Sequence, residues 1–132
     1  MKLAITTDDG YNISKHFGQA PYYQVLTIED GQVTKREMRE KLGHNHFADE
    51  RHRDNDPNQT HGVGPAAKQR HERMTDAISD CQTIICGGMG SGAFQSLQAR
   101  GINPIITDLE NIDEAVKAFI AGKIVNRTDK LH

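Results

Sequence analysis

The sequence predicts a single α/β domain built around a mixed five-stranded sheet. In the first half of the chain, short runs of apolar and β-branched residues include a hairpin signal. In the second half, such runs alternate with segments of helical periodicity. The length of 132 residues suits one core around one sheet. We therefore expect residues 1–132 to fold as one unit.

The first half contains three predicted strands. Residues 2–7 form an apolar run that ends at an Asp-Asp-Gly turn, a pattern typical of a strand buried on both faces. Residues 22–28 are rich in aromatic and β-branched side chains, and Glu29-Asp30-Gly31 separates them from the more polar residues 32–38. This second pattern predicts a β-hairpin whose last strand lies at an exposed edge.

The second half alternates helices and strands. Residues 65–79 carry a thin apolar face at helical spacing. Residues 81–86 predict a buried strand that runs into a glycine-rich turn and then a helix ending at Gly101.

A last strand and a last helix follow. Residues 102–107 repeat the buried-strand pattern, and Pro104 favours an edge position, where a missing N–H costs little. Asn111 and Glu114 resemble a capping pair at the start of an apolar helical stripe over residues 112–120.

Chain connections then predict the strand order 3-2-1-4-5, with strand 2 antiparallel. A helical crossover makes strands 4 and 5 parallel, and strand 4 beside strand 1 reverses the sheet order between them. Ligands of open α/β sheets bind outside the carboxyl ends of strands at such a point. The residues expected there are Asp8, His16, Phe17, the turn 86–92 and Asp108.

Composition restricts the classes of partner. The formal net charge of −2 and the pI near 6.4 argue against a nucleic-acid backbone as partner. No apolar stretch reaches the roughly 18 residues that span a bilayer, and no leader pattern opens the chain, so we expect a cytoplasmic protein with no membrane contact. Cys81 and Cys86 are interpreted as free thiols of a reducing compartment.

A long polar loop over residues 40–64 contains several histidines. His44 and His46 can converge on one metal ion, and His61 lies in the same loop. Imidazole suits zinc and other divalent metals, but the spacing matches no closed structural zinc site. The alternative is a solvated loop without metal.

The glycine-rich turn contains a weak dinucleotide fingerprint. Residues 88–93 match the G-x-G-x-x-A form, but the turn follows the fourth strand, whereas a dinucleotide fold has it after the first. The simpler interpretation is a tight turn that lets the helix start close to the sheet, with free N–H groups that favour an anion.

Three residues are candidate soft or imidazole ligands at the same edge. Cys86 closes a strand beside the glycines, Met89 adds a thioether, and His16 lies in the turn before the second strand. Cys81, at the other end of its strand, is interpreted as structural. No arrangement of catalytic residues stands out, so we expect a binding protein without catalytic activity.

Three segments together resemble the dinitrogenase iron-molybdenum cofactor biosynthesis family, the NifX-like proteins and the C-terminal domain of NifB. The residues that carry the resemblance are Lys2-Leu3-Ala4-Ile5 with Asp8-Asp9-Gly10, Ser14-Lys15-His16-Phe17-Gly18-Gln19-Ala20, and Ile85-Cys86-Gly87-Gly88-Met89-Gly90.

The resemblance implies a three-layer α/β/α, ribonuclease H-like fold. It also implies a carrier that binds an iron-sulfur or molybdenum-containing cluster during cofactor assembly, with assembly proteins as partners and no turnover. The expected cluster-binding residues are Asp8, His16, Phe17, Gly87, Gly88, Met89 and Gly90, and the expected metal ligands are His16, Cys86, His44, His46 and His61. The alternative is a regulatory or interaction module that binds a small anion, a nucleotide or a protein at the glycine-rich turn.

Overall fold

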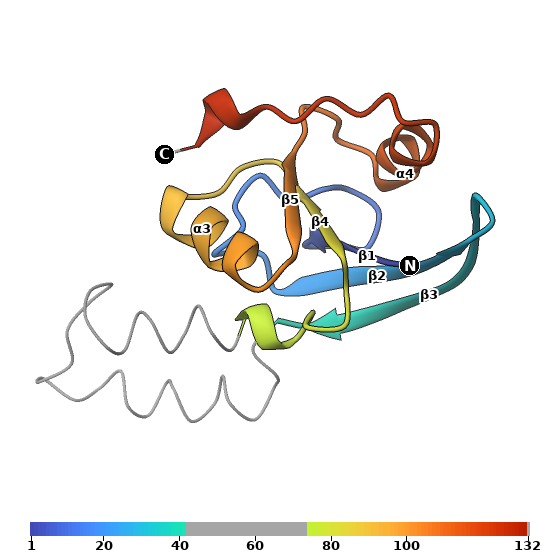
Figure 1. The fold of residues 1–132 in the computed structure, drawn as a ribbon, viewed down its shortest axis with the longest axis horizontal. Coiled ribbons are helices and arrows are strands. Elements are labelled where there is room, and N and C mark those ends of the chain that lie inside the picture. Colours follow the sequence, from blue (N-terminus) through green and yellow to red (C-terminus); the bar gives the residue numbers. More distant parts are fainter. Residues whose placement is uncertain (42–73, 132) are drawn as a thin grey trace, which may run out of the picture.

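The structure, a computed structural model, describes residues 1–41 and 74–131 and shows a mixed five-stranded sheet (Figure 1). The strands are β1 (Lys2–Thr7), β2 (Tyr22–Glu29), β3 (Gln32–Glu40), β4 (Thr83–Cys86) and β5 (Asn103–Ile106). Their order is β3-β2-β1-β4-β5, in which β2 runs antiparallel to both neighbours and β4 pairs parallel with β1 and β5. The predicted strand order and directions are confirmed.

The hairpin between β2 and β3 follows from two residues with positive φ. Asp30 has φ 52° and Gly31 has φ 76°, the combination that a two-residue type I′ turn requires. Glu29 pairs directly with Gln32 across this turn. The register shifts after Thr27, so that β3 bulges close to the turn.

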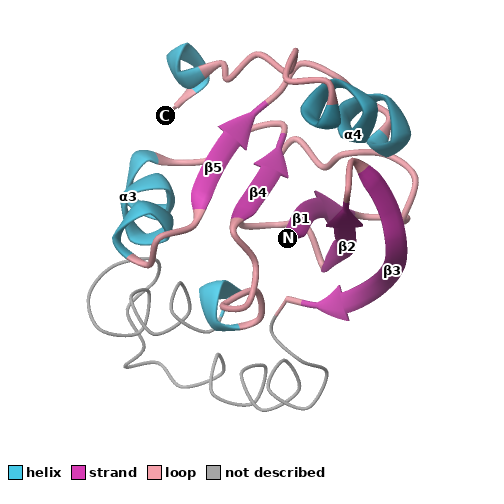
Figure 2. Ribbon diagram, turned by 45° about the vertical axis from the view of Figure 1, so that its right-hand side comes forward, coloured by secondary structure: helices cyan, strands magenta, loops and turns pink. Residues whose placement is uncertain are grey.

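Helices cover the two faces of the sheet, as Figure 2 shows for α3 (Ser91–Ala99) and α4 (Ile112–Ile120). Asn111 caps α4, because its side-chain oxygen accepts from the Glu114 amide at 3.1 Å, as the sequence predicts. Of the predicted helix 65–79 only the end is described, where residues 74–76 are helical and a turn follows. No helix in the described part of the chain is long and apolar enough to cross a membrane.

The two faces of the sheet have different side chains. The face toward α3 and the turn after residue 74, called the sulfur face, contains Ala4, Phe17, Tyr23, Val25, Met74, Ile78, Cys81, Ile84, Cys86, Met89, Ala93, Leu97, Ile102 and Ile106. The face toward α4, called the aliphatic face, contains Leu3, Ile5, Ile13, Leu26, Ile28, Ile85, Ile105, Ile112, Ala115 and Val116. Alternation along each central strand sends successive side chains to opposite faces. This arrangement gives three layers; the ribonuclease H-like name stays a prediction.

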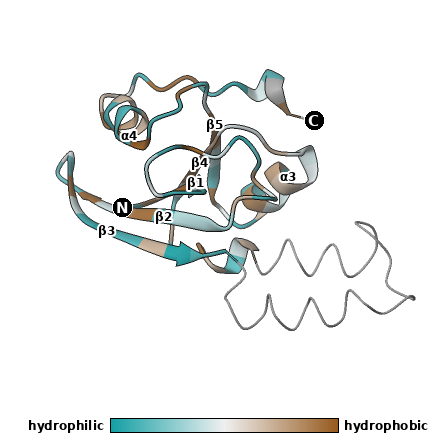
Figure 3. Cartoon of the chain, turned by 180° about the vertical axis from the view of Figure 1, so that it is seen from behind, coloured by the Kyte–Doolittle hydropathy of each residue, from teal (hydrophilic) through white to brown (hydrophobic). Residues whose placement is uncertain are grey.

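The edge of β5 is covered by the C-terminal segment, which ends in the 3-10 helix η1 (Thr128–Lys130). The Asn126 side chain accepts from the Ile106 amide and donates to the Pro104 carbonyl, both at 3.0 Å, and so replaces a neighbouring strand. Pro104 thus lies on an edge strand, as predicted. The other edge, β3, is mostly polar, and its tip is coloured as hydrophilic in Figure 3.

Candidate functional site

Carboxyl ends of the parallel strands meet at one edge of the sheet, called the carboxyl edge. β1 ends at Thr7, β4 at Cys86 and β5 at Ile106. The end of β3 at Glu40 lies at the same edge, because Glu40 pairs with Tyr22 and Tyr22 pairs with Thr7. The order of strands reverses between β1 and β4, so that this is the expected ligand-binding edge of such a sheet.

The loop after β1 is organised by Asp9, whereas Asp8, which the sequence analysis selected, is exposed. The Asp9 carboxylate accepts from the amides of Tyr11 at 2.9 Å and Asn12 at 2.8 Å. These hydrogen bonds lower the pKa of Asp9 to about 2. Thr7 adds a hydroxyl bond to the Asn12 carbonyl at 2.6 Å. An aspartate whose side chain accepts from the amide two residues later forms an Asx turn, and Asp9 with Tyr11 is such a pair.

The loop and the glycine-rich turn are joined by two backbone hydrogen bonds, called the loop–turn bridge. The Gly87 amide donates to the Ser14 carbonyl at 2.9 Å, and the Phe17 amide donates to the Gly88 carbonyl at 3.0 Å. A Cβ on Gly87 would stand 3.0 Å from the Lys15 Cα and from the Ser14 oxygen. Gly87 is therefore required for the close approach of the two segments.

Two sulfur-bearing side chains flank the glycines of the bridge and are buried with Phe17. Cys86 is 0% exposed and Met89 is 2% exposed. Burial raises the pKa of the Cys86 thiol to about 12, against opposing contributions from the Gly88 amide and from Lys41. Cys86 is therefore a neutral thiol in this conformation, and it belongs to the same buried cluster as Phe17 and Met89.

Lys41 is a site residue that the sequence analysis missed. It follows β3 directly at the carboxyl edge and is only 2% exposed. Its Nζ lies 4.3 Å from the ring centroid of Phe17 and 5.4 Å from that of Tyr23. The sequence analysis ended the third strand at residue 38 and placed Lys41 in the polar loop, where a lysine ordinarily predicts a solvated side chain.

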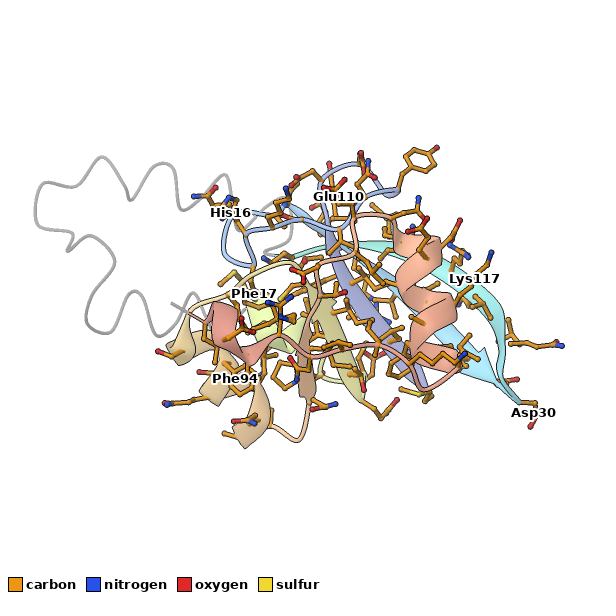
Figure 4. The ribbon with its side chains drawn as sticks, turned by 90° about the horizontal axis from the view of Figure 1, so that it is seen from above. His16, Phe17, Asp30, Phe94, Glu110 and Lys117 are labelled. Atoms are coloured by element: carbon orange, nitrogen blue, oxygen red, sulfur yellow. The ribbon has the colours of Figure 1, made fainter. Side chains whose placement is uncertain are left out.

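His16 is exposed at the rim of the carboxyl edge. Figure 4 places it at the periphery of the molecule, on the opposite side from Lys117. The His16 amide donates to the Ser14 hydroxyl at 3.3 Å, and the His16 carbonyl accepts from the Ala20 amide at 3.0 Å. The backbone is thus fixed while the ring faces solvent.

The structure separates the predicted metal ligands into three groups. His16 is on the surface, Cys86 is in the core, and His44, His46 and His61 lie outside the described residues. Within residues 1–41 and 74–131, no three His, Cys, Asp or Glu side chains are grouped so that they could hold a metal ion. Ligation by both His16 and Cys86 therefore requires the loop–turn bridge to open.

A pocket of about 170 Å³ lies beside the bridge on the aliphatic side. Its lining residues are Ile13, Lys15, Gly87, Thr107, Asp108, Leu109 and Glu110. Lys15 and Glu110 approach to 3.8 Å at this pocket as an exposed ion pair. Asp108, which the sequence analysis placed at this edge, forms an ion pair with Arg127 from the C-terminal segment.

The N-terminus of α3 also reaches the carboxyl edge. Gly90 is its N-cap residue, with no side-chain cap and no acidic residue in the first turn. The amides of this turn therefore receive no side-chain acceptor from the cap position.

Comparison with known proteins finds a family match that includes the residues of the carboxyl edge. The family described as dinitrogenase iron-molybdenum cofactor matches residues 1–122. The chain belongs to this family. Within it, the loop–turn bridge connects the two segments, 14–20 and 85–90, on which the resemblance in sequence rests.

Similar proteins extend over nearly the whole chain. The protein MJ0580 of Methanocaldococcus jannaschii is 26% identical over 124 residues, which cover 94% of this chain and 89% of that protein. The crystal structure of PH0822 has a TM-score of 0.62 at 26% identity and covers 98% of this chain and 96% of its own. The apo form of the orange protein from Desulfovibrio gigas has a TM-score of 0.67 at 20% identity, with 96% and 92% covered, which shows a shared fold.

Proposed function

We propose that this protein binds an iron-sulfur or molybdenum-containing metal–sulfur cluster as cargo at the carboxyl edge and passes it on without chemical turnover. The observation that carries the proposal is the placement of two sulfur donors, Cys86 and Met89, on either side of the bridge glycines. Soft thiolate and thioether ligands suit such clusters. Membership of the family described as dinitrogenase iron-molybdenum cofactor, and a similar protein whose structure is an apo form, support the same class of cargo.

Uptake begins with separation of the loop–turn bridge. Each of its two hydrogen bonds contributes about 1 kcal/mol net, so opening costs a few kcal/mol once Phe17 is partly exposed. Bonds from a thiolate to a metal offset that cost. When the cargo leaves, the loop–turn bridge re-forms. The closed conformation then competes with rebinding of the cargo, and a carrier needs this because it must release what it binds.

The opened bridge provides several kinds of ligand. Cys86 loses its proton to the solvent when a metal binds and becomes the inner thiolate ligand. Met89 adds a weaker thioether, and His16 approaches from the rim with a neutral imidazole. The amides of Gly87 and Phe17, released from their carbonyl partners, donate to sulfides of the cluster. Cofactor-assembly proteins would then be the donors and acceptors of the cargo.

An anaerobic loading experiment tests the proposal. The apo-protein is titrated with an iron-sulfur or a molybdenum–sulfur cluster, passed through gel filtration, and the protein peak is assayed for metal and sulfide. We expect metal and sulfide to co-elute with the protein in a fixed ratio. A bare protein peak, or zinc alone without sulfide, would refute the carrier function.

A matched pair of cysteine variants tests the ligand assignment. Cys81 and Cys86 are both buried thiols of the sulfur face, and burial raises the pKa of each to about 12. Cys81 lies before the start of β4, and Cys86 is the last residue of β4. Cys86→Ala and His16→Ala should lower cluster retention, whereas Cys81→Ala should retain the cluster as the parent does. Equal retention in all three variants would exclude Cys86 and His16 as ligands.

A second candidate function is anion binding by an interaction module at the start of α3. The observation that favours it is the absence of a side-chain cap at Gly90. Under this alternative, phosphate or a nucleotide binds the parent protein and Gly90→Val abolishes binding. Absence of phosphate and nucleotide binding in the parent would eliminate it.

A further inference from the structure

We propose that the outer edge of β3 pairs with the β3 edge of a second copy of this chain, so that two sheets join into one around a two-fold axis at Met38. The paired stretch is residues 36–40, with the sequence Arg-Glu-Met-Arg-Glu. The inference goes beyond the proposed carrier function and does not depend on any cargo.

The two edges of the sheet differ in how their backbone groups are satisfied. At the β5 edge, the Asn126 side chain binds the Ile106 amide and the Pro104 carbonyl. β3 is the last strand at the other edge, and Figure 2 shows it along the outside of the sheet. No strand in the described part of the chain pairs with its outer side. A nine-residue strand with an open edge is a template for pairing with another chain.

The backbone groups that face outward belong to the even-numbered residues of this stretch. The Lys41 amide donates to the Pro21 carbonyl beside β2 at 3.1 Å, so it points inward. Because successive amides of a strand point to opposite sides, the N–H and C=O groups of Arg36, Met38 and Glu40 point away from β2. In an antiparallel pair centred on Met38, these residues meet their counterparts of the second copy in reverse order and exchange hydrogen bonds with them.

The charges along this stretch are complementary to themselves in that register. A two-fold axis through Met38 sets Arg36 opposite Glu40 of the second copy, on the aliphatic face. It sets Glu37 opposite Arg39 of the second copy, on the sulfur face. Symmetry repeats both pairs, so that every charged residue of the stretch faces an opposite charge. Cross-strand pairs of opposite charge stabilise a sheet.

Neighbouring registers lack this complementarity. Side chains of a continuous sheet must keep their own faces, so the two-fold axis has to pass through a residue. An axis through Arg36, Glu37 or Arg39 would place that residue opposite itself, with two like charges in contact. With the axis at Met38, the next pair beyond the stretch would set Lys35 against Lys41, so the complementary region ends at residues 36 and 40.

Exposure along β3 supports the same register. Met38 is 47% exposed in the middle of a charged stretch, and at the axis it would pack against Met38 of the second copy. Glu40 is exposed and makes no ion pair with any residue that the structure describes, whereas Arg36 pairs with Asp113 at 2.9 Å. The second copy would supply a cation opposite Glu40.

Charged residues on an edge strand can also prevent pairing. Such protection is effective when the charges have one sign, because like charges directly opposite repel. Here the signs are reversed across Met38, so that two copies attract each other in one register. Five paired residues bury less area than the roughly 800 Å² per partner of a stable complex. We therefore expect a weak dimer, with a dissociation constant between the micromolar and millimolar ranges.

The experiment is sedimentation equilibrium of the full-length protein without cargo, at low ionic strength and at concentrations up to the millimolar range. We compare the parent with Arg36→Glu and with Glu40→Arg, each of which sets like charges opposite each other in the homodimer. Lys123→Glu is the matched control for Arg36→Glu. It reverses one exposed charge in the segment that leads from α4 to the opposite edge of the sheet.

We expect the parent to dimerise, and to do so less at high salt. Arg36→Glu and Glu40→Arg should each weaken the homodimer by about tenfold or more, and Lys123→Glu should behave like the parent. An equimolar mixture of Arg36→Glu and Glu40→Arg should associate again, because opposite charges then face each other. A parent that stays monomeric at every concentration, or a folded mixture that fails to associate, would overturn the inference.

A second measurement covers the case in which a charge variant does not fold. Residues opposite each other at a hydrogen-bonded position of an antiparallel pair have Cα atoms about 5.5 Å apart, within the range of a disulfide. With an added mild oxidant, Met38→Cys should therefore form a covalent dimer. Thr34→Cys, also exposed on β3, should not, because its two copies lie far apart in this register. Failure of Met38→Cys to cross-link, or equal cross-linking of both variants, would contradict the inference.

Discussion

The sulfur face and the aliphatic face of the sheet are both closed to solvent, yet they use different chemistry. Among the buried residues that the structure describes, the sulfur face contains Met74, Cys81, Cys86 and Met89 together with two aromatic rings, whereas the aliphatic face contains only Leu, Ile, Val and Ala. Thioethers fill irregular space and adapt to change, while branched aliphatic side chains pack in few rotamers. Under the proposed carrier function, we expect the aliphatic half to stabilise the fold and the sulfur half to open.

The helices on the two faces, α3 and α4, also differ in how their ends are stabilised. On the aliphatic face, α4 has an Asn111 cap, two acidic residues in its first turn and Lys117 in its last turn. On the sulfur face, α3 has no side-chain cap at its start, no acidic residue in its first turn, no basic residue in its last turn and a glycine at its second position. Local sequence therefore stabilises α4 strongly, and α3 depends on its packing against the sheet.

The largest expected effect comes from replacing, one at a time, two consecutive residues whose side chains point to opposite faces of the sheet. Ile85 and Cys86 are consecutive, both 0% exposed, and point to the aliphatic and the sulfur face respectively. Ile85→Ala should lower the free energy of unfolding by about 2–5 kcal/mol. Cys86→Ala removes one sulfur atom and should cost only about 1 kcal/mol. Urea denaturation of both variants measures the two values.

Cluster retention should show the reverse order for the same two variants. Ile85→Ala, assayed where it is folded, should retain the cluster like the parent, and Cys86→Ala should lose it. The division into a stabilising face and a binding face fails if Cys86→Ala is as destabilised as Ile85→Ala.

The next largest effect is the loss of folding stability at acidic pH, because ion pairs stabilise the sulfur face. Arg39 from β3 donates to both oxygens of Asp80, at 2.7 and 2.9 Å, and Lys2 reaches the same carboxylate at 3.0 Å. Arg39 holds the pKa of Asp80 well below its ordinary value of 3.8. The aliphatic face has the exposed pair of Arg36 with Asp113.

The sign of the pH dependence follows from the lowered pKa. Stability from Asp80 is fully present above pH 3.8 and is lost as the pH falls through the lower pKa of the folded state. Because the Asp80 side chain is 43% exposed, solvent screening limits its contribution to about 1 kcal/mol or less. Asp80→Asn should therefore lower stability slightly at neutral pH and flatten the acid limb of the stability curve. An acid limb identical to that of the parent in urea unfolding would show that other carboxylates determine it.

The sequence predicted the fold well, because local rules and global topology agree. Positive φ at Asp30 and Gly31, the Asn111 cap and the edge position of Pro104 are all local requirements visible in the residue types. Strand order followed from connection lengths and handedness. Strand bounds differed by at most two residues, as where β3 continues past Met38 to Glu40, whereas the helix predicted to end at residue 79 ends at residue 76.

The candidate site was predicted in outline only. The sequence brought His16, Cys86 and the glycine-rich turn to one edge, but it gave no sign that the loop–turn bridge would bury Cys86. That burial depends on backbone contacts between segments about 70 residues apart, which periodicity does not encode. Lys41 was missed for a similar reason, since a buried cation contradicts the general preference of its residue type.

The smallest predicted effect returns to the weak helix of the sulfur face. Gly92 lies in the first turn of α3, is exposed, and would meet no atom within 4 Å if it carried a Cβ. Gly92→Ala should therefore raise the free energy of unfolding by about 0.5–1 kcal/mol, because alanine restricts the unfolded chain and favours the helix.

If the sulfur face sacrifices stability for binding, this gain should come with a several-fold loss of cluster retention, because the methyl group narrows the approach to the uncapped amides of the turn. The matched substitution on the other face is Lys117→Ala in α4, which should leave cluster retention unchanged. A Gly92→Ala protein that is more stable and retains the cluster fully would limit the binding surface to the loop–turn bridge itself, with the helix end outside it.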